Sequence, residues 1–465
     1  PHMPTIDPTA PAVVVSADSH VGPRLRHDLR AYCPSAYLDD FDAFADAMSG
    51  TADAETAARG LRLSNREFRS GLRRSMDQSV DESKDRLLHP NGDRPGHHEP
   101  RARLEDMDAD GVAAEIIYHA SQNGEVLPFI GDVPVPQDER WAEYTDHAVV
   151  AYDIYNRWLA DFCASDPKRL MGLAYIPVWD VDRCVKTAKS ARSAGLWGVN
   201  FPSCSRPGAR PYNDQVWDPF WAACVDNDLV LNTHASGGPL FDYFSGPGGS
   251  EIVSFEAGGY MAIRAIWHLI FGQVFDRFPD LKVVFTEVAE LFYTSTQWEM
   301  DGWYNRMGRT PLAKGMPSAY FPSNVYQGAS FMSPHQAEHA WREGYADNVI
   351  WGRDYPHREG CYQADLGTDD ETFCRLALRH VLSRVPVQEA IAMAGQNAVR
   401  AFGLDGDYLG EVASRIDAPT GEQLTTPVRD DAYPTTRPEC RALTGAAGPR
   451  PVAEEVMLHE HPVSA

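Results

Sequence analysis

Side chains that can bind a metal ion stand at the ends of several short apolar segments. In chain order they are Asp18, His20, His234, Glu287 and Asp354. Two imidazoles together with carboxylates form a mixed nitrogen and oxygen ligand set, which suits zinc and also manganese or iron. A divalent ion held by such a set lowers the pKa of bound water and polarises a substrate oxygen. These residue types therefore predict metal-assisted chemistry if the fold brings them together.

Taken one at a time, these residues have ordinary structural explanations. A lone aspartate at the end of a strand is most often a helix N-cap, and a lone histidine is most often hydrogen-bonded in the core or at its rim. Asp18 and His20, however, lie two residues apart, so a β-strand would present both on the same side. The remaining candidates end three other apolar segments. Their joint occurrence at strand ends favours one shared site.

Eight short apolar segments rich in β-branched residues are candidates for the strands that position this site. They cover 13–20, 113–120, 170–178, 198–203, 229–235, 282–289, 324–330 and 348–356. Helical patterns separate most of them, for example over 141–164, 181–194, 216–226, 261–278 and 291–307. Near-continuous apolar strands that alternate with helices are typical of a parallel sheet covered on both faces. We therefore predict an α/β fold, a (β/α)8 TIM barrel, in which the carboxyl ends of all strands surround one mouth.

The rival fold is a doubly wound open sheet. That fold has a Gly-rich phosphate-binding turn after its first strand. Residues 16–20 occupy this place and contain no glycine. The sequence therefore favours the closed barrel.

The chain divides into a barrel with three additions. Residues 1–12 are interpreted as a tag remnant and N-terminal lead, and residues 13–404 as the barrel. An insertion over 24–99 follows the first strand and reads as helical over 41–48 and 54–76. Because long insertions in a compact domain are usually functional, we expect a lid or a contact between subunits. Residues 405–465 form an irregular C-terminal extension, and its part from 421 to 465 is either disordered or an arm that wraps a neighbouring subunit.

The composition is that of a folded, acidic protein. The 465 residues include 66 acidic and 42 basic side chains, a formal net charge of −24, and 43% are hydrophobic. An acidic chain without a long Lys/Arg cluster disfavours binding to nucleic acid or to an anionic membrane. No apolar stretch approaches the roughly 20 residues of a membrane-spanning helix. Without an export signal at the N-terminus or a Cys-x-x-Cys pair, we expect a cytoplasmic protein with reduced thiols.

Several motifs are similar to those of a known family. They are Ala-Asp-Ser-His-Val at 17–21, Asn-Thr-His at 232–234, Phe-Pro-Asp-Leu-Lys-Val-Val at 278–284 and Trp-Gly-Arg-Asp-Tyr-Pro-His at 351–357. On these motifs the chain resembles, over about 13–404, the amidohydrolase superfamily, in the amidohydrolase-related branch of aminocarboxymuconate-semialdehyde decarboxylase. The resemblance implies one divalent ion bound by Asp18, His20, His234 and Asp354. It also implies a homodimer or a higher homo-oligomer.

Two positions depart from the family pattern. Asp18 stands where a His or Glu is common, which softens the preference for zinc, and Glu287 stands where many members have an acid/base His. Zinc is still the first expectation for the cofactor, with manganese and iron as alternatives. Dinuclear members of the superfamily carry a carboxylated Lys at the end of the fourth strand, whereas 198–203 contains neither Lys nor an acidic residue. We therefore expect a single metal ion.

The leading functional hypothesis is a metal-dependent hydrolase that attacks a C–N or C–C bond of a small carboxylated or aromatic molecule. Asp354 would act as general base for the ion-activated water, and Glu287 as the second acid/base group or as a further ligand. The same site could instead serve a non-oxidative decarboxylase or a hydratase. A barrel without catalytic activity that binds a ligand or a partner is the alternative of another class, because barrels host many unrelated activities.

Further polar residues stand at or just beyond strand ends. His357, His119 and Tyr355 are the candidates for substrate contact, and Tyr118 stands beside His119. Arg353 alternates with Asp354 along the last strand. The Arg353 side chain is therefore expected to point toward the helices and form an ion pair there.

Overall fold

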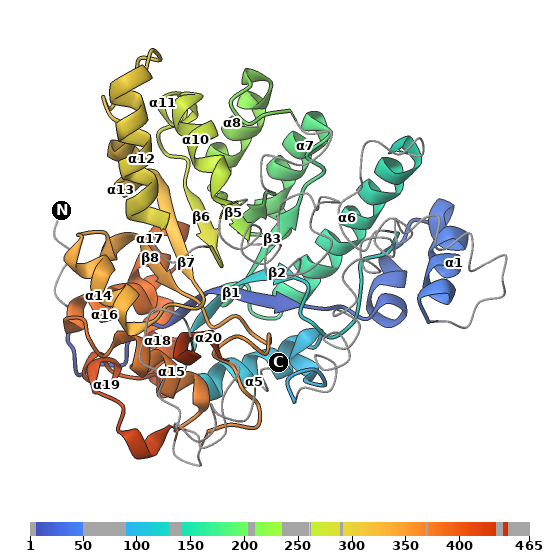
Figure 1. Cartoon of the computed structure of the whole chain (residues 1–465). Coiled ribbons are helices and arrows are strands. Elements are labelled where there is room, and N and C mark those ends of the chain that lie inside the picture. The colour runs from blue at the N-terminus through green and yellow to red at the C-terminus, as the bar shows by residue number, and fades with distance from the viewer. Residues whose placement is uncertain are drawn as a thin grey trace, which may run out of the picture.

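Eight strands form the sheet of the structure. The computed structural model describes residues 6–49, 90–129, 141–202, 210–234, 260, 262–288, 292–367, 371–433 and 440–444. Within these residues the strands follow one another in sequence order, and every neighbouring pair is parallel (Figure 1). The strands are β1 (Val15–Val21), β2 (Ala114–His119), β3 (Leu170–Tyr175), β4 (Gly198–Asn200), β5 (Val230–His234), β6 (Val283–Thr286), β7 (Val325–Ala329) and β8 (Val349–Trp351).

The sheet closes where its first and last strands meet. Ser19 of β1 forms a parallel bridge with Tyr355, just after β8. The amide nitrogens of His20 and Asp354 donate to the carbonyl oxygens of Tyr355 and Asp18, at 2.6 and 3.0 Å. The predicted (β/α)8 barrel is confirmed, and the carboxyl ends of its strands lie at one mouth.

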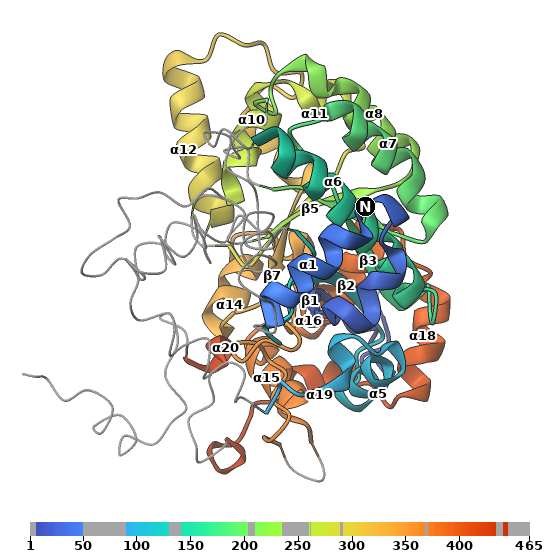
Figure 2. The ribbon, with the colours of Figure 1, turned by 90° about the vertical axis from the view of Figure 1, so that its right-hand side faces the viewer.

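Helices surround the barrel and mostly follow the predicted alternation with the strands (Figure 2). The longer ones are α1 (Leu38–Ser49), α5 (Pro100–Asp110), α6 (Trp141–Cys163), α7 (Val181–Ala191), α8 (Asp218–Asp226), α12 (Phe292–Met307), α14 (Pro334–Arg342), α15 (Phe373–Leu382) and α18 (Gly406–Arg415). The shorter ones are α10 (Ala265–Phe271), α11 (Val274–Arg277), α13 (Phe321–Asn324), α16 (Val387–Ile391), α17 (Asn397–Phe402), α19 (Gly421–Thr425) and α20 (Arg441–Thr444). The helix predicted over 261–278 is divided into α10 and α11, because Gln273 between them adopts a left-handed conformation with φ of 57°. Among the described residues, no helix has the length and apolar character needed to cross a bilayer.

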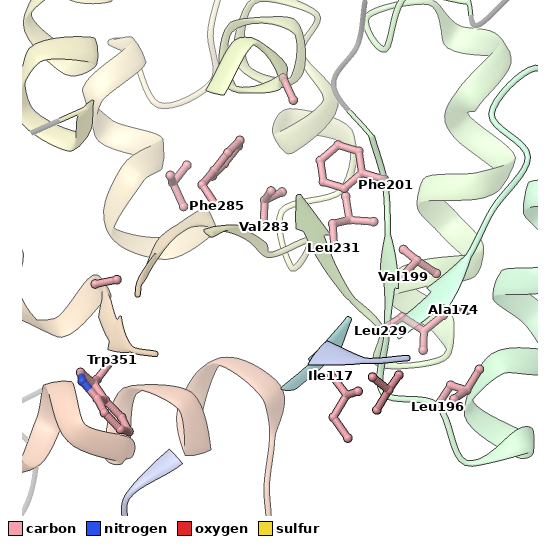
Figure 3. Close-up of a cluster of buried hydrophobic side chains, with 14 of the residues drawn as sticks. Ile117, Ala174, Leu196, Val199, Phe201, Leu229, Leu231, Val283, Phe285 and Trp351 are labelled. Atoms are coloured by element: carbon pink, nitrogen blue, oxygen red, sulfur yellow. The ribbon is translucent and has the colours of Figure 1, made fainter. Parts of the chain in front are cut away.

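Alternate residues along the strands build two apolar clusters. One fills the inside of the barrel and joins strands from all around it, with members such as Val15, Ile116, Val230, Val284 and Ile350. The other lies between the strands and the helices and includes Ile117, Leu231, Phe285 and Trp351 (Figure 3). Successive residues such as Val284 and Phe285 thus belong to different clusters. This alternation decides which side chains at the strand ends face the mouth.

The described part of the insertion after β1 packs against helix α6. Helix α1 confirms the helix predicted over 41–48, and its Phe41 is buried. The hydroxyl groups of Tyr37 and Tyr32 donate to the carboxylates of Asp146 and Asp161 of α6, at 2.9 and 2.6 Å. The second helix predicted in the insertion, over 54–76, lies outside the described residues.

The first part of the C-terminal extension corrects the prediction of an irregular tail. Helices α18 and α19 occupy this part of the chain. Leu409, Val412 and Ile416 recur at helical spacing and join the cluster inside the barrel. Burial of these apolar side chains stabilises a helix in a segment that was predicted to be irregular. Residues 434–439 and 445–465 lie outside the described part, so the idea of an arm around a neighbouring subunit stays a prediction.

Candidate metal centre

Asp18 and His20 reach the barrel mouth because β1 contains a β-bulge. The register of β1 against β2 shifts in the middle of the strand, where β1 has one extra residue. Ala17 belongs to the cluster inside the barrel, so simple alternation would turn Asp18 outward. The extra residue restores the inward direction for Asp18 and for His20, which pairs with the inward-facing Tyr118 of β2.

Side chains from four strand ends converge on one point. Nε2 of His20 lies 3.1 Å from Oδ1 of Asp18 and 3.2 Å from Oδ1 of Asp354. Nε2 of His234 lies 3.6 Å from Oδ1 of Asp18 and 3.5 Å from Oε2 of Glu287. Overlapping groups of these residues have their ligand atoms within 4.8 Å of one another. The structure thus brings together all five residues that the sequence singled out for metal binding and catalysis.

Several buried polar atoms of this cluster have no hydrogen-bond partner. They include Oδ1 of Asp18, Nε2 of His20 and Oδ2 of Asp354. All three side chains are at most 2% exposed. Buried polar atoms are normally satisfied, and a divalent cation satisfies carboxylate oxygens and an imidazole lone pair at the same time. The donor set therefore fits one metal ion.

Outer hydrogen bonds aim the ligand atoms. Nδ1 of His20 lies 2.7 Å from the carbonyl oxygen of His119, so Nδ1 carries the hydrogen and Nε2 presents its lone pair to the cluster. The hydroxyl of Ser330 donates to Oδ2 of Asp18 at 2.5 Å, which leaves Oδ1 for the ion. Because these ligands are already oriented, binding an ion requires little rearrangement.

His357 holds a ligand residue in place. Its ring stacks on His20 with centroids 3.9 Å apart. Nδ1 of His357 lies 2.9 Å from Oδ1 of Asp354, and Nε2 lies 2.7 Å from the carbonyl oxygen of Ala120. Burial disfavours the imidazolium, but the Asp354 carboxylate outweighs it and raises the pKa of His357 to about 10. Nε2 is held by a backbone carbonyl and Nδ1 faces the Asp354 carboxylate at ion-pair distance. The geometry supports a role in orienting Asp354, and the substrate contact predicted for His357 stays a prediction.

Glu287 and Asp354 have left-handed backbone conformations, with φ of 55° and 51°. This conformation is uncommon outside glycine and costs on the order of 1 kcal/mol or more. Thr286 faces the inside of the barrel, where its hydroxyl lies 2.9 Å from the hydroxyl of Tyr118, so alternation would turn Glu287 outward. The left-handed turn instead brings the Glu287 carboxylate back to His234. Backbone strain at two residues of one cluster is typical of functional sites.

The side chain of His119 does not face the ligand cluster of Asp18, His20, His234, Glu287 and Asp354, and the substrate contact predicted for His119 stays a prediction. Tyr118 and His119 are successive residues of β2, and Tyr118 points into the barrel. His119 therefore points outward, where its ring meets the rings of Tyr155 and Tyr175 at 5.2 and 6.2 Å. Tyr118 is the residue beside the cluster, with its ring centroid 5.0 Å from that of His234. Strand alternation is the sequence signal that separates the two.

Tyr355 also points away from the ligand cluster, and the substrate contact predicted for it likewise stays a prediction. Its hydroxyl donates to Oδ2 of Asp106 at 2.7 Å. The guanidinium of Arg103 lies 4.0 Å from the centre of its ring, and the side chain is fully buried. Tyr355 follows Asp354 in the chain, so it faces the helices by the same alternation.

A buried ionic network connects the strands that carry His20 and Asp354 on their helix-facing side. Glu115 of β2 is fully buried and accepts hydrogen bonds from Arg353 and Arg103. Arg353 precedes Asp354 and points toward the helices, as its alternation predicts. Arg103 also donates to the carbonyl oxygen of His20. One carboxylate therefore links the backbone around two ligand residues.

Glu115→Gln should weaken the binding of a divalent metal ion about 10- to 100-fold, the usual effect of losing an outer partner of metal ligands. The neutral amide no longer balances Arg353 and Arg103, so the backbone that they hold can shift. Calorimetric titration of the folded variant measures the Kd, with the Tm recorded in parallel. Asp108→Asn is the control, because it removes an ion pair of 2.6 Å with Arg169 that touches no ligand residue. Equal Kd values for Glu115→Gln and the unchanged protein would contradict the prediction.

Solved structures that share this fold include bacterial decarboxylases. The chain is similar to 5-carboxyvanillate decarboxylase from Novosphingobium aromaticivorans, solved with manganese and 3-methoxy-4-hydroxy-5-nitrobenzoic acid, with 19% identity, a TM-score of 0.55, and coverage of 86% of this chain and 98% of that one. 5-carboxyvanillate decarboxylase from Sphingomonas paucimobilis is 20% identical, with a TM-score of 0.52 and coverage of 84% of this chain and 99% of that one. Dihydroxybenzoic acid decarboxylase from Polaromonas, solved with manganese and 2-nitroresorcinol, is 17% identical, with a TM-score of 0.52 and coverage of 86% of this chain and 99% of that one. At these identities the likeness shows the shared fold.

A family model gives independent support from the sequence. The model described as amidohydrolase matches residues 85–404, which is more than half of the chain. The matched region contains β2 to β8 and therefore His234, Glu287 and Asp354. The resemblance inferred from the motifs is confirmed, and the chain belongs to the amidohydrolase family.

Proposed function

We propose that this chain catalyses the metal-dependent, non-oxidative decarboxylation of a small aromatic carboxylic acid. The sequence placed hydrolysis first and decarboxylation second, and we reverse that order. The solved structures of similar fold named above are decarboxylases of aromatic acids. The observation that carries the proposal is the largely buried carboxyl group of Glu287, which lies beside the ligand cluster.

Glu287 is suited to donate a proton. Burial raises the pKa of its carboxyl well above the usual range, and the Asp354 and Asp18 carboxylates add to this effect while His234 opposes it. A group that stays protonated can deliver its proton to carbon. Asp354 is less suited to act as the base that hydrolysis requires, because His357 outweighs the effect of burial and holds the pKa of Asp354 below its usual range. The site therefore favours proton donation over activation of water.

Asp18, His20, His234 and Asp354 would hold the ion, and we propose Mn²⁺ as the metal in place of the zinc expected first. Aspartate oxygens make up half of this set, and Glu287 offers a further carboxylate oxygen. Oxygen-rich sites suit manganese better than thiolate-rich or imidazole-only sites do. Two of the solved structures of similar fold contain manganese. Such an ion, when bound, supplies positive charge that orients a substrate carboxylate and stabilises negative charge on neighbouring oxygen.

The reaction requires one proton transfer at the carbon that carries the carboxylate. The proton moves from the carboxyl of Glu287 to this carbon, and the bond between the carbon and the carboxylate breaks. Its electron pair stays with the carbon, so carbon dioxide leaves and the aromatic product carries a hydrogen in its place. Glu287 then regains a proton from water. The ring of Tyr118 lies beside the imidazoles and supplies an apolar wall for an aromatic substrate.

The proposal is tested by identifying the products of the Mn²⁺-loaded protein. We expect carbon dioxide release from 5-carboxyvanillate, 2,6-dihydroxybenzoate or a related hydroxybenzoate, and incorporation of one deuterium at the vacated carbon in D₂O. Removal of the metal with a chelator should abolish the reaction, and Mn²⁺ should restore it. Release of an amine or alcohol from aromatic amides or esters, without carbon dioxide, would support the hydrolase instead. A protein that binds no divalent metal and turns over none of these compounds would support the inactive barrel.

A further inference from the structure

Two cysteine thiols from distant parts of the chain face each other in the structure. The sulfur of Cys440 lies 3.9 Å from the sulfur of Cys361, although the two residues are 79 positions apart. Both side chains are fully buried. The spacing of the eight cysteines along the sequence does not single out this pair. The fold therefore brings together two thiols that the sequence does not relate.

Cys361 belongs to the loop that carries a candidate metal ligand. Its amide donates to the carbonyl oxygen of Arg353 at 2.8 Å, and Arg353 directly precedes Asp354. The amide of Gly360 donates to the carbonyl oxygen of His357 at 3.1 Å. Cys361 is thus fixed to the backbone on both sides of Asp354. A covalent bond at Cys361 would act directly on this loop.

Cys440 begins the last described segment of the chain, 440–444. The amide of Arg441 donates to the carbonyl oxygen of Glu359 at 2.9 Å. The amide of Leu443 donates to the carbonyl oxygen of Cys440 at 3.1 Å, and the Leu443 side chain is buried. Helix α20, in this segment, packs against α15 (Figure 2). The C-terminal extension therefore returns to the loop that follows β8.

We propose that Cys361 and Cys440 form a reversible disulfide, which fastens the C-terminal segment to the loop that carries Asp354 and His357. A disulfide requires about 2 Å between its sulfur atoms. Rotation about the Cα–Cβ bonds moves each sulfur, so two thiols that already face each other can make this approach. The pair is a site of redox modification, and its formation does not depend on the reaction at the metal centre.

Hydrogen peroxide is an oxidant that is small and uncharged enough to reach two buried thiols. One thiol, as its thiolate, attacks a peroxide oxygen, the O–O bond breaks, and a sulfenic acid and water form. The second thiol then attacks the sulfenic sulfur, the S–S bond forms, and a second water leaves. Two electrons thus pass from the thiols to one peroxide, and dithiothreitol returns them by thiol–disulfide exchange. The Cys440 thiol and burial raise the pKa of Cys361 well above its usual range, so we expect a slow oxidation.

Peptide mapping of the folded, peroxide-treated protein tests the pairing. Remaining thiols are labelled with N-ethylmaleimide after denaturation, and the protein is digested without reductant. The peptides of Cys361 and Cys440 should be joined, with two fewer labels than the eight of the reduced protein. Dithiothreitol before denaturation should restore all eight. Amide hydrogens of 441–444 should exchange about tenfold or more slowly after oxidation, because opening the segment then requires the loop to move as well.

Single substitutions provide the controls. Cys440→Ala should show neither the link nor the slower exchange, whereas Cys184→Ala, at a buried thiol that donates to a backbone carbonyl, should show both. Cys374 lies near both thiols, and Cys374→Ala should leave the link intact. The proposal is overturned if Cys361 and Cys440 of the unchanged protein stay labelled, overoxidise separately or pair with other cysteines. A link that leaves the exchange of 441–444 unchanged would overturn the fastening of the segment.

Discussion

His20→Asn should abolish Mn²⁺ binding and lower decarboxylation at least about 10³-fold, because a catalytic ion contributes several kcal/mol and each ~1.4 kcal/mol is tenfold in rate. Nε2 of His20 lies within 3.2 Å of carboxylate oxygens of both Asp18 and Asp354. The shorter asparagine side chain cannot bring a lone pair to this point. The two carboxylates would then face each other without the imidazole between them. Both ion binding and the orientation of the remaining ligands are therefore lost together.

Metal content by elemental analysis and carbon dioxide release measure the two effects of His20→Asn separately. His380→Asn is the matched control, because His380 is partly buried on α15 and its Nδ1 lies 2.7 Å from the Tyr433 hydroxyl, outside the ligand cluster. This control should keep both the ion and the activity. A His20→Asn variant that retained one ion per chain would contradict the ligand set itself. Bound metal without activity would instead limit the role of His20 to catalysis.

The ligand cluster could be predicted from sequence because its members end strands, and the strand ends of a closed barrel necessarily meet. This inference places Asp18, His20 and Asp354 at the site without any knowledge of how the loops fold. The β-bulge in β1 and the left-handed turn at Glu287 could not be predicted, because both depend on backbone conformation that residue types do not specify. Without them, alternation would have turned Asp18 and Glu287 away from the site. The five residues therefore converge as the strand ends predict, but two of them do so through backbone irregularities, the bulge and the left-handed turn, that the sequence did not predict.

Strand alternation explains the other outcomes. It placed Arg353 toward the helices correctly, and the same rule, applied to β2, selects Tyr118 over His119. Glu115 gave a signal that was not used: a carboxylate inside an apolar strand must be paired. Helix α18 was missed because its few apolar residues are effective only against the end of the barrel, a surface that exists after the other elements have packed. Packing against the rest of the barrel thus makes α18 helical, although this segment was predicted to be irregular.

Glu287→Gln should lower kcat about 10²- to 10⁴-fold, the usual contribution of a positioned acid or base. The amide preserves the size and polarity of the side chain but holds no acidic proton for the substrate carbon. If Glu287 is the acid, the Mn²⁺ Kd changes little, because the other four residues still hold the ion. If Glu287 is a ligand, the Mn²⁺ Kd rises and kcat falls together. Calorimetry and single-turnover release of carbon dioxide distinguish these two roles, which the sequence left open.

The pH dependence gives a second test of Glu287 as the proton donor. The acid must be protonated to act, so kcat of the unchanged enzyme should be high below the raised pKa of Glu287 and fall as the pH rises through it. Glu287→Gln should show a low kcat without this alkaline decline. Glu125→Gln is the matched control, because burial also raises the pKa of Glu125, and that carboxylate accepts from the Leu25 amide at 2.8 Å, outside the ligand cluster. Near-native turnover by Glu287→Gln, with deuterium still incorporated from D₂O, would show that another group delivers the proton and would remove the observation on which the decarboxylase proposal rests.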